Sequence, residues 1–252
     1  MNTEMIFTFI LVFARVTSFL FFVPFLRGSY IPSTAKVAIG MGISVYGVGM
    51  MPTVEMGNMF ELFGLVVINI VIGLVLAYFV EILFQAIQMA GSLMDFDMGL
   101  SMAEVVDPSG GGRKTVVAGI YQTIFVVVFI AVGGIQALLM NLIYTFKLTD
   151  PSFFVLKGEF LEMLLATIAF MLAATLQIGL PFMASIFIVN FVFLIIGRAS
   201  PQMNIFANMF MVKIMIGLVF LILILPYLSE LMISYSQVIN EKMQETITMI
   251  YK

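Results

Sequence analysis

Residues 163–197 read MLLATIAFMLAATLQIGLPFMASIFIVNFVFLIIG and contain no charged side chain. As one α-helix this stretch is roughly 50 Å long at 1.5 Å per residue, whereas the apolar core of a bilayer is about 30 Å thick. Pro181 lies near the middle, just after Gly179. Proline inside a helix removes a backbone hydrogen bond and favours a bend or a break. The stretch therefore predicts either one bent membrane helix or a tight hairpin of two helices.

The same apolar character extends over most of the chain. Of its 252 residues 62% are hydrophobic and 10% are charged, and the mean hydropathy is +1.17. A soluble domain carries about 25% charged residues, so this inventory could not cover its surface. Six apolar units are predicted, at 5–26, 36–54, 60–80, 115–146, 163–197 and 209–229. The expected fold class is an all-α membrane protein of about six hydrophobic helical units, including long broken or hairpin helices, in a single integral membrane subunit over 1–252.

The residue types of most catalytic and metal sites are missing from the sequence. It contains no cysteine and no histidine, which removes thiol chemistry, the commonest general base and the commonest metal ligand. We therefore expect no enzymatic activity, no cofactor and no metal site. The net charge of −3 indicates no basic surface for nucleic acid. No basic residue precedes Arg15, so the first unit is expected to stay in the mature protein rather than act as a signal peptide.

The distribution of basic residues does not fix the orientation in the membrane. Lys and Arg accumulate in cytoplasmic loops, but six spans put six basic residues on one side and four on the other. Either the span boundaries are wrong, or some hydrophobic helices pack inside a complex instead of facing lipid. The two sets are Arg27, Lys36, Arg113, Lys114, Arg198 and Lys213 against Lys147, Lys157, Lys242 and Lys252.

A polar stripe follows the third unit. Its members recur at spacings of 4, 3, 4 and 3 residues, which places them on one face of a helix, and an apolar stripe lies opposite. Such a helix is either an ordinary amphipathic helix at a membrane surface, or it turns the stripe toward an aqueous channel or a neighbouring subunit. The polar members are Glu81, Gln85, Gln88, Ser92 and Asp95, and the apolar members are Leu83, Ile87, Ala90, Met94 and Met98.

A glycine-rich segment, residues 99–115, separates this stripe from the fourth unit. Asp107-Pro108 is a turn former, and Gly110–Gly112 leave the backbone almost unrestrained. Lys114-Thr115 resembles the end of a phosphate-binding loop, but Arg113 stands where a glycine should precede the lysine. The segment is predicted to be a flexible loop that serves either as a plain connector or as a movable gate.

Arg15 is a charge near the centre of the first apolar unit. A charge at that depth costs a few kcal/mol, so it needs a partner or an exit to water. Glu4 is roughly 16 Å away along a helix and is no local partner. A carboxylate or a helix C-terminus on another segment or subunit is expected to meet the guanidinium, unless Arg15 extends to an interface.

The last residues, 230–252, are predicted to form an amphipathic C-terminal helix. Apolar side chains recur there at helical spacing between charged ones. Such a helix suits a membrane interface or the docking of another subunit equally well. The apolar positions, beginning just upstream, are Leu228, Leu231, Met232, Tyr235, Val238, Ile239, Met243, Ile247 and Ile250.

Three passages in register resemble one family, the flagellar biosynthetic FliR proteins and their counterparts in virulence type III secretion. Length and segment order agree from end to end, so the resemblance covers essentially the whole chain. The passages are Phe13–Phe19 with Pro24 and Ile31–Val37; Gln85–Gly91 with Asp97–Ser101 and Asp107-Pro108; and Asn190–Arg198 with Ala199–Phe206.

This resemblance implies a structural subunit of a protein export gate. The family occurs with several copies of the smaller membrane proteins FliP and FliQ, and it looks like a fusion of FliP-like and FliQ-like parts in a helical core that is only partly embedded in lipid. FlhB, FlhA, exported unfolded flagellar proteins and membrane lipid are the further expected partners. The expected location is the bacterial inner (cytoplasmic) membrane at the flagellar basal body, where the protein would be multi-pass.

The resemblance also implies a role for the glycine-rich segment. In the family, the loop matching Val105–Thr115 lies in the lumen and helps to plug the closed channel. The positions that inherit this expected role are Val106, Asp107, Pro108, Ser109, Gly110, Gly111 and Gly112.

Three alternatives remain open from the sequence. A virulence secretion gate would carry the same features as a flagellar one. A stand-alone secondary transporter could use Arg15, Asp95 and Asp97, but it would usually show a clear inverted repeat, and only a faint echo is visible. An intramembrane enzyme is disfavoured, because Asp95 and Asp97 are two positions apart and would point to different faces of a helix.

Overall fold

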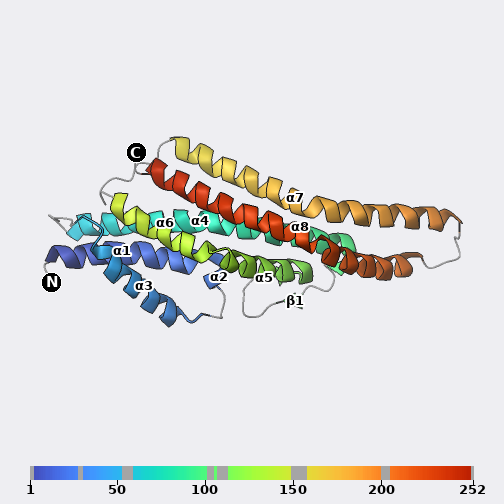
Figure 1. Ribbon diagram of the computed structural model, residues 1–252, viewed down its shortest axis with the longest axis horizontal. Coiled ribbons are helices and arrows are strands. Elements are labelled where there is room, and N and C mark those ends of the chain that lie inside the picture. The colour runs from blue at the N-terminus through green and yellow to red at the C-terminus, as the bar shows by residue number, and fades with distance from the viewer. Residues whose placement is uncertain are drawn as a thin grey trace. The chain divides into compact units, whose positions relative to one another are not determined.

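The computed structural model describes residues 3–27, 31–52, 59–100, 105–106, 113–148, 158–199 and 205–250. Over these residues the chain is almost entirely helical, with one two-stranded antiparallel pair (Figure 1). The elements are α1 (Thr3–Phe22), α2 (Pro24–Arg27), α3 (Ser33–Val48), α4 (Met59–Met98), β1 (Val105–Val106), β2 (Arg113–Lys114), α5 (Val116–Ala131), α6 (Gly134–Leu148), α7 (Gly158–Ala199) and α8 (Ile205–Ile250).

The predicted all-α membrane class is confirmed, although the number of units is only approximate. Four described helices are long and apolar enough to cross a membrane, and the pair α5 and α6 makes a fifth if it counts as one span. The unit predicted at 36–54 is shorter than expected. Its helix, α3, has 16 residues, below the roughly 20 that a bilayer core requires.

Three helices are longer than the sequence predicted, and Figure 1 shows each as one uninterrupted ribbon. α4 has 40 residues, so the third apolar unit and the polar stripe after it form one helix. α7 has 42 residues and keeps Pro181 inside it, so the stretch at 163–197 is one helix and not a hairpin. α8 has 46 residues and runs from the last apolar unit through the amphipathic tail. At 1.5 Å per residue each is about 60 Å long or longer, twice the thickness of a bilayer core.

The glycine pair Gly133-Gly134 predicts a break within the long apolar unit at 115–146, and the structure confirms it. α5 ends at Ala131 and α6 begins at Gly134. Gly133 has a φ of +78°, a left-handed conformation that an L-residue with a side chain rarely adopts. A glycine in this conformation just after a helix is a common helix terminator, so the glycine pair stops α5 here.

The chain divides into two compact units. The first comprises Met1–Leu83, Gly133–Thr167 and Ser236–Lys252, and the second comprises Phe84–Val132 and Ile168–Tyr235. The long helices α4, α7 and α8 each contribute to both. Each unit has its own buried side chains, which are described separately below.

In the first unit α1 packs against α3. Gly40 of α3 is buried, and a Cβ added there would lie 3.1 Å from the Cγ2 atom of Thr17, so the glycine permits close approach. Ser44, four residues on, is also fully buried. By contrast, Gly42 is exposed, and nothing lies within 4 Å of a Cβ added there.

The second unit has an aromatic core. Phe84 of α4 lies edge-on to Phe125 and Phe129 of α5, with ring centroids 4.8 and 6.1 Å apart. All three side chains are at most 1% exposed. α7 and α8 meet through Phe182 and Phe220, whose centroids are 5.9 Å apart. These contacts fix the position of α5, and α5 begins directly after the glycine-rich segment.

Candidate functional site

The candidate site lies in the second unit, where α4 ends and the glycine-rich segment begins. The first residue after α4 is Gly99, with a φ of +82°. The ring of Phe210, from α8, packs so closely here that an added Cβ would lie 2.7 Å from its Cε2 atom. A side chain at Gly99 is therefore disfavoured twice, by the backbone conformation and by the lack of space. The segment leaves α4 at a defined point.

Within the segment, a short antiparallel pair of strands brings residues 105–106 next to residues 113–114. Val105 in β1 is opposite Lys114 in β2, and Val106 is opposite Arg113. Val106 is thus the one predicted plug residue that the structure describes. Asp107, Pro108, Ser109, Gly110, Gly111 and Gly112 lie outside the described residues.

Asp95 fixes the other end of the segment. Its side chain is fully buried, and its carboxylate accepts hydrogen bonds from the backbone N–H groups of Val117 (2.9 and 3.2 Å) and Ala118 (3.2 Å). These N–H groups belong to the first turn of α5, where they have no partner within the helix. The residue in the N-cap position, Thr115, makes no side-chain capping bond. A carboxylate from α4 therefore caps α5; we call this arrangement the Asp95 cap.

Close helix packing makes the Asp95 cap possible. Gly91 precedes Asp95 by one helical turn, and a Cβ added to it would collide with the Cα atom of Ala118. Ser92 and Thr115 are also adjacent, with hydroxyl oxygens 3.5 Å apart. The sequence suggested Ser92 and Asp95 as stripe members, but it gave no sign that Gly91 brings α5 to them.

The stripe residues have different environments. Gln85 is exposed, whereas Glu81, Gln88 and Ser92 are partly buried and Asp95 is fully buried. Glu81 belongs to the first unit and forms an ion pair with Arg27 at 3.6 Å. The five residues of the opposite, apolar stripe are all buried, at no more than 2% exposure each: Leu83, Ile87, Ala90, Met94 and Met98.

The first unit contains a second buried charge. Arg15 is 0% exposed, and its guanidinium donates to the Oδ1 atom of Asn69 in α4 through Nε (2.9 Å) and Nη2 (2.6 Å). Nη1 donates to the carbonyl and hydroxyl oxygens of Thr145, both at 3.1 Å. The ring of Phe146 lies beside it, with its centroid 5.5 Å from Cζ. We call Arg15, Asn69, Thr145 and Phe146 the Arg15 cluster.

Two features of the Arg15 cluster explain how it accommodates a buried guanidinium. Thr145 is in the last turn of α6, where backbone carbonyls lack helical partners and the helix dipole is negative. Of the two expected kinds of partner, the structure thus places a helix C-terminus beside Arg15. Gly73, one turn after Asn69, allows α1 to approach, because an added Cβ would collide with Ser18 and the carbonyl oxygen of Arg15.

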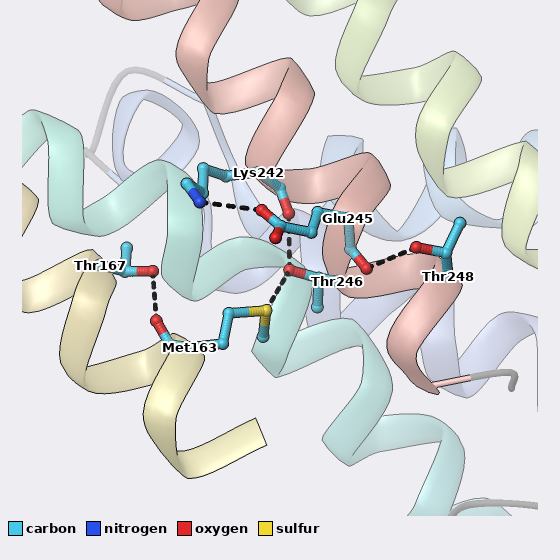
Figure 2. Close-up of polar contacts among 6 residues, drawn as sticks. All are labelled: Met163, Thr167, Lys242, Glu245, Thr246 and Thr248. Atoms are coloured by element: carbon cyan, nitrogen blue, oxygen red, sulfur yellow. Dashed lines mark hydrogen bonds and ion pairs between the residues drawn. The ribbon is translucent and has the colours of Figure 1, made fainter. Parts of the chain in front are cut away.

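The end of α8 packs against the beginning of α7 within the first unit (Figure 2). The hydroxyl of Thr246 donates to the carbonyl of Lys242 at 2.6 Å and lies 3.4 Å from the sulfur of Met163. Lys242 forms an ion pair with Glu245 at 2.8 Å on the exposed side. Three apolar residues of α8 that belong to the first unit are at most 4% exposed: Ile239, Met243 and Ile247.

α7 and α8 expose large apolar side chains along most of their length. In the most apolar stretch of α7 only 22% of the residues are buried within the chain, and in that of α8 only 11% are. The corresponding share in α4 is 44%. On α7 the exposed apolar residues extend from Leu161 (61%) to Ile196 (39%). Such a large exposed apolar surface indicates contact with a membrane or with other proteins.

Among the described residues there is no group of three or more Asp, Glu, His or Cys side chains placed to bind a metal ion. Arg15 and Asp95 hold helices together through the hydrogen bonds described above. In the described part of the site these two side chains thus fix the positions of the helices that they join.

Comparison with known proteins identifies the family of this chain. The family described as bacterial export proteins, family 1, matches residues 6–238. The flagellar biosynthetic protein FliR of Bacillus subtilis is 26% identical over 220 residues, covering 85% of this chain and 84% of the relative. FliR of Aquifex aeolicus is 25% identical and covers 94% and 92%. The surface presentation of antigens protein SpaR of Shigella flexneri is 25% identical and covers 82% and 80%.

The family match covers most of the chain, and the apolar helices found in the structure lie within or overlap the matched residues. The resemblance noted on three sequence passages is thereby confirmed. The chain therefore belongs to the bacterial export proteins, family 1, as a FliR-type membrane protein.

Proposed function

We propose that this protein is a structural, non-enzymatic subunit of a type III protein export gate. It would form part of the channel that passes unfolded flagellar proteins, and it would help to close that channel. Its place would be the bacterial inner membrane at the flagellar basal body. The description of the matching family as bacterial export proteins supports export as the process, and the FliR relatives support the flagellar setting.

The observation that carries the proposal is the length of the exposed apolar face of α7. From Leu161 to Ile196 this face extends about 52 Å along the helix at 1.5 Å per residue. A bilayer core about 30 Å thick could cover it only if a straight helix tilted by roughly 55°, beyond the usual range of about 0–40°. Lipid alone therefore leaves part of the face uncovered, so protein neighbours are needed.

We propose FliP-like and FliQ-like proteins, in several copies, as those neighbours, with FlhB and FlhA as further partners of the same assembly. The apolar faces of α7 and α8 supply the surface for such contacts. Within the stripe, exposed Gln85 and partly buried Gln88 are the residues best placed to face the lumen or a neighbouring subunit.

We further propose that the segment from Val106 to Gly112 plugs the resting channel. The described residues around it support this role, because both of its ends are held in place. Gly99 fixes where the chain leaves α4, β1 pairs with β2, and the Asp95 cap fixes where α5 begins. A segment anchored at both ends can obstruct a pore without being carried away by a passing polypeptide.

Native mass spectrometry of the protein in mild detergent tests the assembly. The chain is purified with and without co-expressed FliP-like and FliQ-like proteins. The expected result is a defined large complex that contains this chain. A monodisperse single protein that does not bind these partners would contradict the proposal and favour the transporter alternative.

Ion leak through the assembled gate tests the plug. Deleting Gly110–Gly112 should raise the resting conductance, because the shortened segment no longer fills the pore. The matched control replaces the same three glycines with alanines, which keeps the length and nearly the volume. Unchanged conductance in the deletion variant would argue against a plug. Leak in both variants would show that closure requires the backbone flexibility of the glycines and not the segment length alone.

A virulence secretion gate is the second candidate, because SpaR matches with an identity similar to that of the flagellar relatives. Restoration of motility in a bacterium lacking its own FliR, against restoration of virulence secretion in one lacking SpaR, separates the two. We favour the flagellar role, since flagellar relatives cover up to 94% of the chain.

A further inference from the structure

We propose that the beginning of α3 binds the phosphate group of an anionic phospholipid, held by the ammonium of Lys36 and by the first backbone N–H groups of the helix. The site lies in the first unit, where the end of α1 meets the start of α3. It is independent of the export role proposed above, because it concerns contact between this chain and the membrane.

The first argument is that α3 begins without a side-chain cap. Its N-cap residue is Pro32, and no side chain there bonds to the helix. The carbonyl of Pro32 accepts from the N–H groups of Ala35 (2.9 Å) and Lys36 (3.3 Å). The N–H groups of Ser33 and Thr34 have no acceptor within the helix, and both residues are exposed. Two donors and the positive end of the helix dipole are therefore available to an anion.

The second argument, independent of the first, is the environment of Lys36. A cation in the first turn of a helix is opposed by the dipole, so cations are favoured at the other end. Lys36 is nonetheless only 6% exposed. Its ammonium lies 5.4 Å from the ring centroid of Phe21, in the last turn of α1. Within the described part of the chain this ammonium makes no hydrogen bond and no ion pair. An anion at the start of α3 would supply the missing opposite charge.

The third argument is that the ammonium and the two N–H donors lie at the same end of α3. The Cα–Cβ bonds of a helix tilt toward its N-terminus, so the side chain of Lys36 leans that way. The packing of α1 on α3 agrees with this direction. Gly47 is next to Val12, and Gly40 is next to Thr17, so the residues before Gly40 lie beside the last turns of α1. A phosphate has several acceptor oxygens and can meet all three donors at once.

The surroundings favour a lipid as the source of the phosphate. α1 has 20 residues and is about 30 Å long, the thickness of a bilayer core, so its last turn reaches the level of the headgroups when it crosses the membrane. Exposed apolar side chains flank the site, since Phe22 is 46% and Ile39 is 51% exposed. Aromatic and basic side chains together are typical of a membrane interface, where anionic headgroups attract lysine. Acyl chains would cover these apolar side chains, whereas free phosphate would not.

Native mass spectrometry of the full-length protein in a neutral detergent tests the site. Phosphatidylglycerol is the anionic probe, phosphatidylcholine with the same acyl chains is the zwitterionic probe, and inorganic phosphate is the free anion. Phosphatidylglycerol should bind roughly fivefold more tightly than phosphatidylcholine, as expected for one lysine near an anionic headgroup. Inorganic phosphate should displace it only weakly, because it gains nothing from the apolar side chains around the site.

Replacement of Lys36 tests the charge. Lys36→Met removes the ammonium and keeps the buried apolar stem, so it should weaken the binding of phosphatidylglycerol roughly tenfold. The matched control is Lys242→Met, which removes the same charge from a partly exposed ion pair with Glu245 and should leave the binding unchanged. Equal affinity of wild type and Lys36→Met, or an equal loss in both variants, would overturn the site.

Replacement of Ser33 tests the backbone donors. Ser33→Pro removes one N–H group at the first helical position, where proline is well tolerated, and should weaken binding roughly threefold. Ser33→Ala keeps this N–H group and loses only the hydroxyl, so it should weaken binding less. The same affinity in both variants would exclude the N–H group of Ser33 as a ligand and contradict the proposed geometry.

A substitution that strengthens the helix separates binding from folding. In Pro32→Asp the new carboxylate sits at the N-cap, accepts from the first-turn N–H groups and stabilises α3. The variant should lose phosphatidylglycerol and still remain monodisperse to at least the wild-type temperature. Retained binding in this variant would overturn the site even if Lys36→Met failed to fold. If inorganic phosphate binds with the affinity of the lipid and depends equally on Lys36, the phosphate site stands and the lipid source is refuted.

Discussion

Arg15 in the first unit and Asp95 in the second are both fully buried, and each is met by a helix end of opposite polarity. The positive guanidinium lies against the last turn of α6, where the carbonyl of Thr145 accepts from it. The negative carboxylate lies against the first turn of α5, where two N–H groups donate to it. In both places the protein uses backbone groups that a helix end leaves without partners.

The two charges differ in how far they reach along the chain. The hydrogen bonds of Arg15 connect residues 54 and 130 positions apart and tie three helices together, α1, α4 and α6. Those of Asp95 connect residues 22 and 23 positions apart and tie α4 to α5. The Arg15 cluster therefore connects three helices of the first unit, whereas the Asp95 cap acts locally, at one end of the glycine-rich segment.

α4 has the same residue arrangement at the Arg15 cluster and at the Asp95 cap. It carries Asn69 and Gly73 at one and Gly91 and Asp95 at the other, so a polar residue and a glycine lie four positions apart on one face. Each glycine lets a neighbouring helix reach backbone contact, and each polar side chain then bonds across the contact. A close backbone approach is what brings a short polar side chain within hydrogen-bond distance.

Replacement of Arg15 should have the largest effect. Arg15→Leu removes the charged donor from the buried oxygens of Asn69 and Thr145 and should cost about 3 kcal/mol of stability. Arg15→Lys should recover less than half of that, because an ammonium cannot reproduce the planar fork of the guanidinium. The stability of both variants is measured as the temperature at which the detergent-solubilised protein loses monodispersity. The matched control is Arg27→Leu, at a partly exposed ion pair worth less than about 1 kcal/mol. Wild-type behaviour of Arg15→Lys would show that charge alone suffices.

The two glycines should come next. Gly73→Ala and Gly91→Ala each insert a Cβ into backbone atoms of the neighbouring helix and should cost about 2 kcal/mol. Because Gly73 lies in the first unit, its variant should loosen α1, and the Gly91 variant should loosen α5. Hydrogen exchange of peptides from these two helices separates the effects. Equal exchange in both helices for either variant would contradict the local roles assigned to the two contacts.

Loss of the Asp95 cap should have a smaller effect on stability. Asp95→Ala removes a charged cap and should cost about 1 kcal/mol, in the range of other helix N-caps. Faster amide exchange is expected at the start of α5, with no change in α1 or at the end of α6. Exchange that rises throughout both units would mean that Asp95 supports the whole fold, as Arg15 is expected to support the first unit.

The smallest effect is expected at Gly64, which is in the same helix as Gly73 and Gly91. It is exposed, and nothing lies within 4 Å of an added Cβ. Gly64→Ala should therefore be neutral or stabilise the helix by up to about 1 kcal/mol, since alanine has the higher helix propensity. A loss of stability there, or of assembly with partner proteins, would reveal a contact made outside this chain.

Much of the fold could be predicted from the sequence, because hydrophobic runs and helix breakers are local signals. The all-α membrane class followed from long uncharged runs, and the break between α5 and α6 followed from Gly133-Gly134. The lengths of α4, α7 and α8 could not be predicted in the same way. Pro181 left a bent helix and a hairpin open, and α7 continues through it as one helix. α8 runs without interruption from apolar residues into its amphipathic tail.

The candidate site was predictable only in part. Arg15 and Asp95 stood out as polar residues near apolar runs, and a helix C-terminus was among the partners expected for Arg15. Asn69, Gly73 and Gly91 gave no such signal, because an asparagine or a glycine in a long apolar helix has many uses. Their roles depend on which helix lies opposite, and that information is spread over residues up to 130 positions apart.

The sequence by itself determined that this chain is an α-helical membrane protein of the export family, because apolar run length and motif order are properties of the chain alone. The tertiary structure decided which charges are buried, which helix ends receive them and where the glycine-rich segment is anchored. The physical reason is that a buried charge needs hydrogen-bond partners about 3 Å away, and here such proximity arises when helices pack.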